Sequence, residues 1–163
     1  MPVYCCDALH WTANRADQQP YDFILAFDLV IEDFCEVPQL DNFNETGGKE
    51  VATLGGRLCV MTSQNYDVWV MKDYMVKESW TKPFSISLPD EIWRSSRLLG
   101  YSSRGDRVLL LRGDDYLWHD PEKKQAEIVE SCCSEPPEIP AICERSLVSL
   151  RAYKGTRRRG HSN

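Results

Sequence analysis

The sequence predicts an all-β fold, specifically an incomplete β-propeller of about three four-stranded antiparallel blades. Short runs rich in β-branched and aromatic residues alternate with segments of Asn, Asp, Gly, Ser and Pro, a pattern typical of strands and turns. These runs recur in the same order in a unit of about 47 residues whose length varies. The offsets are 49 and 50 between Ala8, Arg57 and Arg107, and 45 and 47 between Asp28, Asp73 and Asp120. No long amphipathic helix pattern interrupts them. A repeated four-stranded unit of this length is characteristic of propeller blades.

The strands of each copy can be placed from this pattern. In the first copy we expect strands at 8–11, 23–28 and 34–38. In the second copy we expect them at 51–54, 57–61, 68–73 and 80–84. In the third copy we expect them at 98–102, 107–111, 116–120 and 127–130.

The third strand of each copy ends with an aspartate, at Asp28, Asp73 and Asp120. We expect these residues to stabilise the turns that follow, because an Asp side chain can accept hydrogen bonds from the next backbone amides. A β-sandwich is the alternative fold, since it also has short strands and regular turns. It gives no reason, however, for the same strand ending to recur.

Three tryptophans fall within expected strands whose two faces both need cover, Trp11, Trp69 and Trp118. We expect them to pack between blades, because large aromatic side chains dominate core packing.

The number of blades does not close a ring. Propellers typically have at least four blades, because an open ring exposes an apolar blade face and free strand edges. We therefore expect part of a longer protein, a truncated gene product, or an assembly that closes through another chain. Residues 1–150 form this partial domain, with one more strand expected at 141–150. Residues 151–163 carry Arg157, Arg158 and Arg159 and are expected to be a basic disordered tail, with a nuclear-localisation patch as the alternative.

Composition excludes several functions. The formal charge of −6 disfavours nucleic-acid binding, which depends on clustered Lys and Arg. No stretch has the roughly 18 apolar residues of a membrane span, and the N-terminus lacks a signal-peptide pattern. We therefore expect no membrane association, and a cytoplasmic or nuclear location.

The seven cysteines do not predict a metal site. They include no Cys-x-x-Cys pair and have no histidine at ligand spacing, so we expect neither a metal nor a cofactor. Cys35 and Cys59 lie within apolar strands, where a reduced cysteine behaves as a small buried hydrophobic residue.

No catalytic residues are indicated. Propellers host hydrolases, but such chemistry requires converging carboxylates or a nucleophile with a histidine base. His10 lies in an expected strand, His119 precedes a turn aspartate, and His161 lies in the tail. We therefore expect a binding protein and not an enzyme, with a propeller hydrolase as the alternative.

Several motifs are more specific than the strand pattern. They include 8–11 (Ala-Leu-His-Trp), 24–29 (Ile-Leu-Ala-Phe-Asp-Leu), 54–60 (Leu-Gly-Gly-Arg-Leu-Cys-Val), 67–82, 98–102, 120–124 and 146–150. In order and spacing, these motifs resemble the F-box-associated domain of plant F-box/kelch-repeat proteins, over residues 8–150. S-locus F-box proteins are similar relatives.

This resemblance implies a role in protein ubiquitination. In that family an N-terminal F-box binds the Skp adaptor of an SCF-type E3 ubiquitin ligase, and the associated domain selects the target protein. The chain departs from the family pattern because no F-box helices precede the first repeat. Binding to the Skp adaptor is therefore expected only if a longer form supplies an F-box. A regulatory fragment and a non-functional remnant are the alternatives.

The target is expected to bind at the loops of one propeller rim, because loops vary while strands are committed to packing. The candidate loops are 13–22, 39–49, 88–97 and 131–140. Within them, the residue types that dominate protein interfaces are Arg15, Tyr21, Phe43, Trp93 and Arg94. Each has an alternative role, as a loop side chain folded back on its own blade.

Overall fold

A computed structural model describes residues 2–14, 22–41, 43, 48–63, 66–86, 96–113 and 115–129 of the chain. These residues form three separate four-stranded antiparallel sheets, each made from consecutive strands. The three sheets match the three predicted repeats. They are not the two facing sheets of the alternative β-sandwich.

The first sheet contains β1 (Val3–Cys5), β2 (Ala8–Asn14), β3 (Asp22–Asp28) and β4 (Asp33–Glu36). The second contains β5 (Lys49–Leu54), β6 (Arg57–Thr62), β7 (Asp67–Met71) and β8 (Trp80–Ser85). The third contains β9 (Ser96–Tyr101), β10 (Val108–Arg112), β11 (Asp115–Asp120) and β12 (Gln125–Ile128). The short 3₁₀ helix η2 (Lys77–Ser79) precedes β8.

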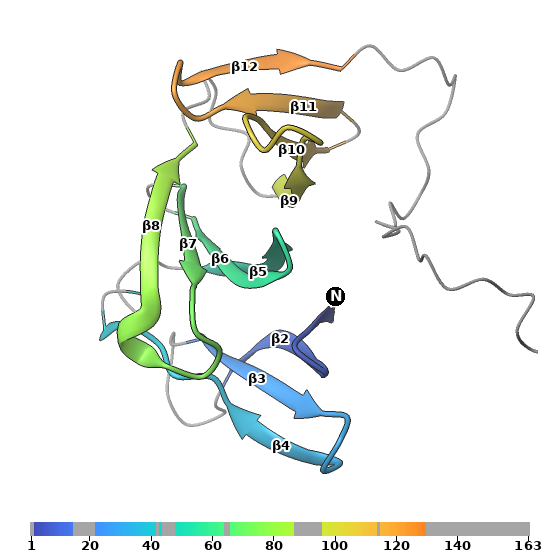
Figure 1. The fold of residues 1–163 in the computed structure, drawn as a ribbon, viewed down its shortest axis with the longest axis vertical. Coiled ribbons are helices and arrows are strands. Elements are labelled where there is room, and N and C mark those ends of the chain that lie inside the picture. The colour runs from blue at the N-terminus through green and yellow to red at the C-terminus, as the bar shows by residue number, and fades with distance from the viewer. Residues whose placement is uncertain are drawn as a thin grey trace, which may run out of the picture.

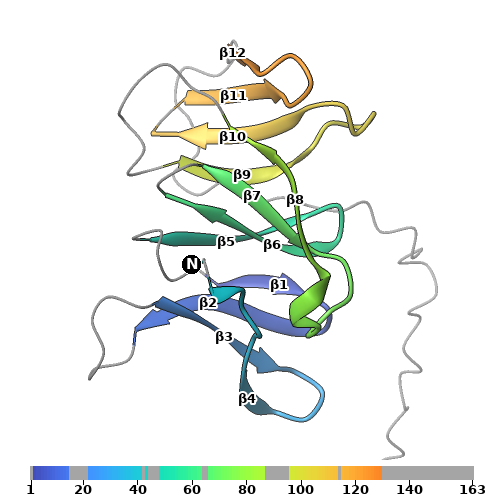
Figure 2. The ribbon, with the colours of Figure 1, turned by 90° about the vertical axis from the view of Figure 1, so that its left-hand side faces the viewer.

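The three sheets follow one another along an arc, with the second between the other two (Figure 1). Strand β5 contacts β1 and β2 on one side and β9 on the other, which Figure 2 shows from the side. Two apolar cores fill the spaces between successive sheets. Ile24, Leu58 and Trp80 belong to the core between the first and second sheets, and Leu54 and Leu110 to the core between the second and third.

The first sheet has one strand more than the sequence predicted. Val3–Cys5 forms β1, which pairs with β2 through a turn at Cys6 and Asp7, both with positive φ. The turn between β5 and β6 has the same form, with φ of 60° at Gly55 and 72° at Gly56. Two positive φ values suit the two-residue hairpin turn that matches strand twist. The matching turns confirm that the first and second sheets repeat one unit.

The aspartate turns are confirmed at two of the three positions. One carboxylate oxygen of Asp28 accepts hydrogen bonds from the amides of Val30 and Ile31, at 2.7 and 3.1 Å. Asp120 does the same for the amides of Glu122 and Lys123, at 3.0 Å each. Asp73 lies two residues beyond β7, and its backbone carbonyl accepts the Ser79 hydroxyl at 2.8 Å.

Of the three tryptophans predicted to pack between blades, Trp69 packs between two described sheets, whereas Trp11 and Trp118 lie on faces that no other described sheet covers. Trp69 packs against the core between the first and second sheets. Trp11 and Trp118 alternate with the buried residues of their strands and lie on outward faces. The sequence pattern places a residue in a strand, but the face it occupies depends on which side of the sheet has a neighbour.

Candidate protein-interaction surface

The outward face of the first sheet is unusually apolar. Along β2 and β3, the buried Ala8, His10, Ile24 and Ala26 point toward the second sheet. The alternate residues therefore point away from it. Cross-strand pairing groups them on one face: Tyr4 with Leu9, Leu9 with Phe27, Trp11 with Leu25, and Phe27 with Phe34. We call these six residues the first-sheet outer face.

The aromatic rings on this face contact one another. The Phe34 ring lies 4.9 Å from that of Phe27 and 6.2 Å from that of Trp11 between centroids, the second pair in an edge-to-face arrangement. Phe34 remains 60% exposed and Tyr4 59% exposed. Exposed aromatic groups of this kind are enriched where proteins meet other proteins. The first-sheet outer face is therefore the candidate interaction surface.

The turn between β3 and β4 extends this apolar surface. Val30 is 75% exposed and Ile31 70% exposed, and both amides are held by the Asp28 carboxylate. A fixed backbone presents these side chains to solvent at a lower ordering cost than a loose loop would. The turn thus holds two exposed apolar side chains on a hydrogen-bonded backbone.

The first sheet as a whole is acidic. Described residues 2–14 and 23–36 contain no Lys or Arg, and they contain five carboxylates: Asp7, Asp28, Glu32, Asp33 and Glu36. A single-sign field of this kind favours partners with basic residues and disfavours acidic ones.

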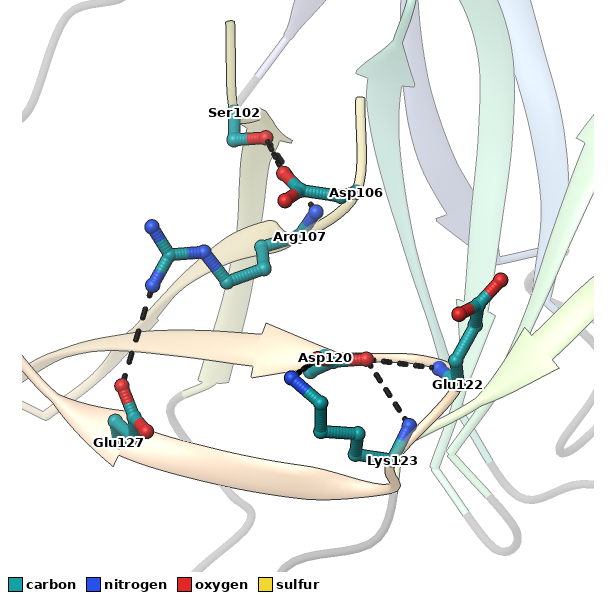
Figure 3. Close-up of polar contacts among 7 residues, drawn as sticks. All are labelled: Ser102, Asp106, Arg107, Asp120, Glu122, Lys123 and Glu127. Carbon is teal, nitrogen blue, oxygen red and sulfur yellow. Dashed lines mark hydrogen bonds and ion pairs between the residues drawn. The ribbon is translucent and has the colours of Figure 1, made fainter. Parts of the chain in front are cut away.

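The third sheet has an outward face of its own. Leu109 pairs with Trp118, Leu111 with Tyr116, and Trp118 with Glu127, opposite in direction to the buried Leu110 and Leu117. The guanidinium of Arg107 lies 5.1 Å from the centre of the Trp118 ring and 3.9 Å from the Glu127 carboxylate. Figure 3 shows Arg107 reaching toward Glu127 across the sheet. We call these five residues, together with Arg107, the third-sheet outer face.

Phe43, one of the five predicted binding residues, lies in the core and not on a surface. It is 1% exposed, and its ring contacts those of Trp69 and Trp80, with centroids at 5.4 and 5.3 Å. Its predicted role at an interface is therefore wrong in this structure. The reason is physical, since a loop between two sheets can contribute an apolar side chain to the core beneath it. Arg15, Tyr21, Trp93 and Arg94 lie outside the described residues.

The two histidines of the described residues lie in the cores between sheets. His10 is fully buried, and its Nε2 lies 2.8 Å from the Tyr74 hydroxyl. His119 is also fully buried, with its ring centroid 6.3 Å from that of Phe84. Burial lowers the pKa of both imidazoles. Each imidazole therefore takes up a proton less readily than an exposed histidine does.

The cysteines and the charged groups of the described residues do not assemble a metal centre. Within that part of the chain, no cluster of three or more His, Cys, Asp or Glu could hold a metal ion. Cys59 is fully buried in β6, and burial raises the pKa of its thiol. Cys35 is half-buried in β4. Over the same residues, no helix has the length and apolar character to cross a membrane.

Comparison with known proteins identifies homologues. No protein-family model matches the chain. The chain is 36% identical over 133 residues to the F-box protein CPR1 of Arabidopsis thaliana, an alignment covering 76% of this chain and 32% of that protein. A second Arabidopsis thaliana F-box protein is 41% identical over 83 residues, covering 48% of this chain and 20% of that protein. A third is 27% identical over 88 residues.

The chain spans about a third of the length of the first of these relatives and about a fifth of the other two. The matches agree with the resemblance carried by the sequence motifs. Over the aligned residues the chain is therefore similar to plant F-box proteins.

Proposed function

We propose that the chain is the target-recognition part of an F-box subunit of an SCF-type E3 ubiquitin ligase, and that it binds a protein and carries out no catalysis. The observation that carries the proposal is the 36% identity to an F-box protein over 76% of the chain. The all-β architecture agrees with it, because repeated sheets offer loops and faces for recognition while their cores stay rigid.

We further propose that the three sheets are consecutive blades of an incomplete β-propeller of kelch type. Their succession along one arc and the apolar cores between neighbours support this assignment. In such a fold the target contacts the loops at one rim, including those with Arg15, Tyr21, Trp93 and Arg94. The Skp adaptor binds only where an F-box is present in the same polypeptide. The location is cytoplasmic or nuclear.

Ubiquitination provides the test. The chain is fused behind an F-box module from an unrelated protein and expressed in plant cells treated with a proteasome inhibitor. Proteins whose ubiquitinated peptides increase are compared with those in cells that express the F-box module alone. We expect at least one protein to gain ubiquitin only with the fusion, and to bind the purified chain directly.

A matched pair of variants sharpens the result. Replacing both Trp93 and Arg94 with alanine should abolish binding and ubiquitination of that protein, whereas Val76→Asp, at an exposed position outside the candidate loops, should leave both intact. The proposal is wrong if no protein gains ubiquitin beyond the F-box control, or if those that do fail to bind the purified chain.

A further inference from the structure

The first-sheet outer face corresponds, residue by residue, to a face that is buried in the second sheet. The correspondence follows from strand register. In the second sheet Cys59 pairs with Val70, so the adjacent Leu58 and Met71 fall at the next position of the same register, and Met71 pairs with Trp80. In the first sheet Leu9 pairs with Phe27, which pairs with Phe34. The two sets therefore occupy equivalent positions on equivalent strands.

The equivalent positions differ sharply in burial. Leu58, Met71 and Trp80 are 1%, 2% and 5% exposed, because the first sheet packs against them. Phe34, the counterpart of Trp80, is 60% exposed. An apolar sheet face that is repeatedly buried within the chain, and left open at one end, is the usual sign of a missing neighbour.

The first-sheet outer face should pack against a sheet placed relative to it as the first sheet is placed relative to the second. Within the chain, each sheet receives the following sheet on one face, and this happens twice. The first and second sheets each have a following sheet packed on one face. Among the described residues, only the corresponding face of the third sheet, the third-sheet outer face, lacks such a cover. It presents Leu109, Leu111, Tyr116 and Trp118 for that contact.

Charge is complementary between the two faces. The first sheet carries carboxylates and no Lys or Arg over its described residues, whereas the guanidinium of Arg107 stands above Trp118 on the third-sheet outer face. Described residues 96–113 and 115–129 contain six basic and five acidic residues. Opposite potentials steer the two faces together and disfavour pairing of two acidic first sheets.

We propose that the first-sheet outer face is the docking site for the third-sheet outer face of a second copy of this chain. The contact extends the stacking that already joins the first sheet to the second and the second to the third. It buries the exposed aromatic rings of Tyr4 and Phe34 against an apolar face that carries the Arg107 guanidinium beside the Glu127 carboxylate.

Two copies can bury both outer faces at the same time. In a twofold dimer, the third sheet of each copy packs on the first sheet of the other, so no outer face stays open. The resulting six sheets fall within the range of four to eight blades seen in closed propellers. This inference concerns self-association and does not depend on the ligase role, so either can fail while the other stands.

Sedimentation of the 163-residue chain over protein concentrations from about 1 to about 100 μM measures the association. We expect a species of twice the 18.8 kDa chain mass at the upper end of this range. Phe34→Asp and Arg107→Glu should each weaken the dimer at least tenfold. The first buries a carboxylate in an apolar contact, and the second places a negative charge opposite the acidic first sheet. Both residues are substantially exposed, so the variants should keep the wild-type melting profile.

Two control variants alter charge away from these faces. Val76→Asp and Arg104→Glu change exposed residues in the loop before η2 and in the β9–β10 turn, and both should dimerise like the wild type.

Mixing the two weakened variants tests the head-to-tail arrangement. The third sheet of the Phe34→Asp chain and the first sheet of the Arg107→Glu chain are both unaltered, so a mixture contains one intact interface. We expect the mixture to dimerise more strongly than either variant alone. A wild-type chain that stays monomeric at all concentrations, a dimer unaffected by both substitutions, or a mixture no stronger than its components overturns the proposal.

Discussion

The Nε2 atom of His10 lies 2.8 Å from the hydroxyl of Tyr74, and this contact joins β2 of the first sheet to the loop that follows β7 of the second. The same imidazole lies 3.3 Å from the backbone carbonyl of Val3 through Nδ1. Most buried polar side-chain groups in proteins have a hydrogen-bond partner, and both nitrogens of the His10 ring have one. The contact therefore holds together two sheets whose residues are 64 positions apart.

Removing the Tyr74 hydroxyl should destabilise the chain. Tyr74→Phe keeps the ring but leaves one nitrogen of buried His10 without its partner, which costs about 1–2 kcal/mol. Tyr4→Phe is the matched control, because the Tyr4 hydroxyl bonds Asp7 at an exposed site. Urea unfolding should show a lower midpoint for Tyr74→Phe and little change for Tyr4→Phe. Equal midpoints for the two variants would mean that the His10–Tyr74 contact has no structural role.

Two phenylalanines in apparently similar segments should differ in importance. Phe43→Ala removes a ring packed between Trp69 and Trp80 and should lower the free energy of unfolding by about 3 kcal/mol. Phe34→Ala removes a mostly exposed ring and should cost less than about 1 kcal/mol in the monomer. Denaturant unfolding at low protein concentration compares them. A larger loss for Phe34→Ala would contradict the assignment of Phe43 to the core.

Stability should depend on the charge of Glu50. Burial raises the pKa of this carboxyl to about 7, against the opposing effect of the Arg97 charge. Between pH 4.5 and 7 the folded chain therefore binds a proton that the unfolded chain has released. The stabilising contribution is complete below pH 4.5 and is lost as the pH rises through about 7.

Glu50→Gln removes this titration. The substitution should raise stability at pH 8 by about 1–2 kcal/mol relative to its effect at pH 5, because the neutral amide avoids the cost of a half-buried charge. Thermal melts of both proteins at the two pH values measure the difference. A substitution effect independent of pH would show that Glu50 is ionised throughout this range.

The buried histidines should make stability depend on pH in the direction opposite to Glu50. Burial lowers the pKa of His10 and of His119, so below about pH 6.5 the unfolded chain binds protons that the folded chain does not. Their contribution to stability is complete above that pH and is lost as the pH falls. In the Glu50→Gln background, the melting temperature should therefore drop from pH 7 to pH 5.

His119→Leu in the same background checks the source of that drop. Leucine preserves apolar packing against Phe84 but cannot be protonated, so the drop between pH 7 and pH 5 should become smaller. An undiminished drop would assign the pH dependence to other groups.

Much of the strand pattern could be predicted from the sequence, because alternation and turn residues are local signals. Eleven of the twelve predicted strands overlap strands of the three sheets, and the twelfth, at 141–150, lies outside the described residues. Val3–Cys5 was not predicted, since three residues carry too little alternation to distinguish a strand from an irregular segment. The feature that marks this strand is the turn at Cys6 and Asp7. That turn is identified by its positive φ values, which the sequence does not show.

The candidate surface could not be predicted in the same way. The sequence predicts that Trp11 and Trp69 both lie in strands. Trp11 lies on an outward face, however, whereas Trp69 packs against a core. The difference depends on which sheets become neighbours, and that is a long-range property. The burial of Phe43 beneath a loop depends on the same long-range packing.

The exposure of Phe34 relative to Trp80 tests the account most directly, because the two residues occupy equivalent positions in the first and second sheets. Oxidative footprinting with mass spectrometry measures the reactivity of each side chain at low and high protein concentration. We expect Phe34 to react readily at low concentration and to become protected at high concentration, with Trp80 protected at both. Protection of Phe34 at every concentration, or reactivity that never changes, would contradict an open face that a second copy covers.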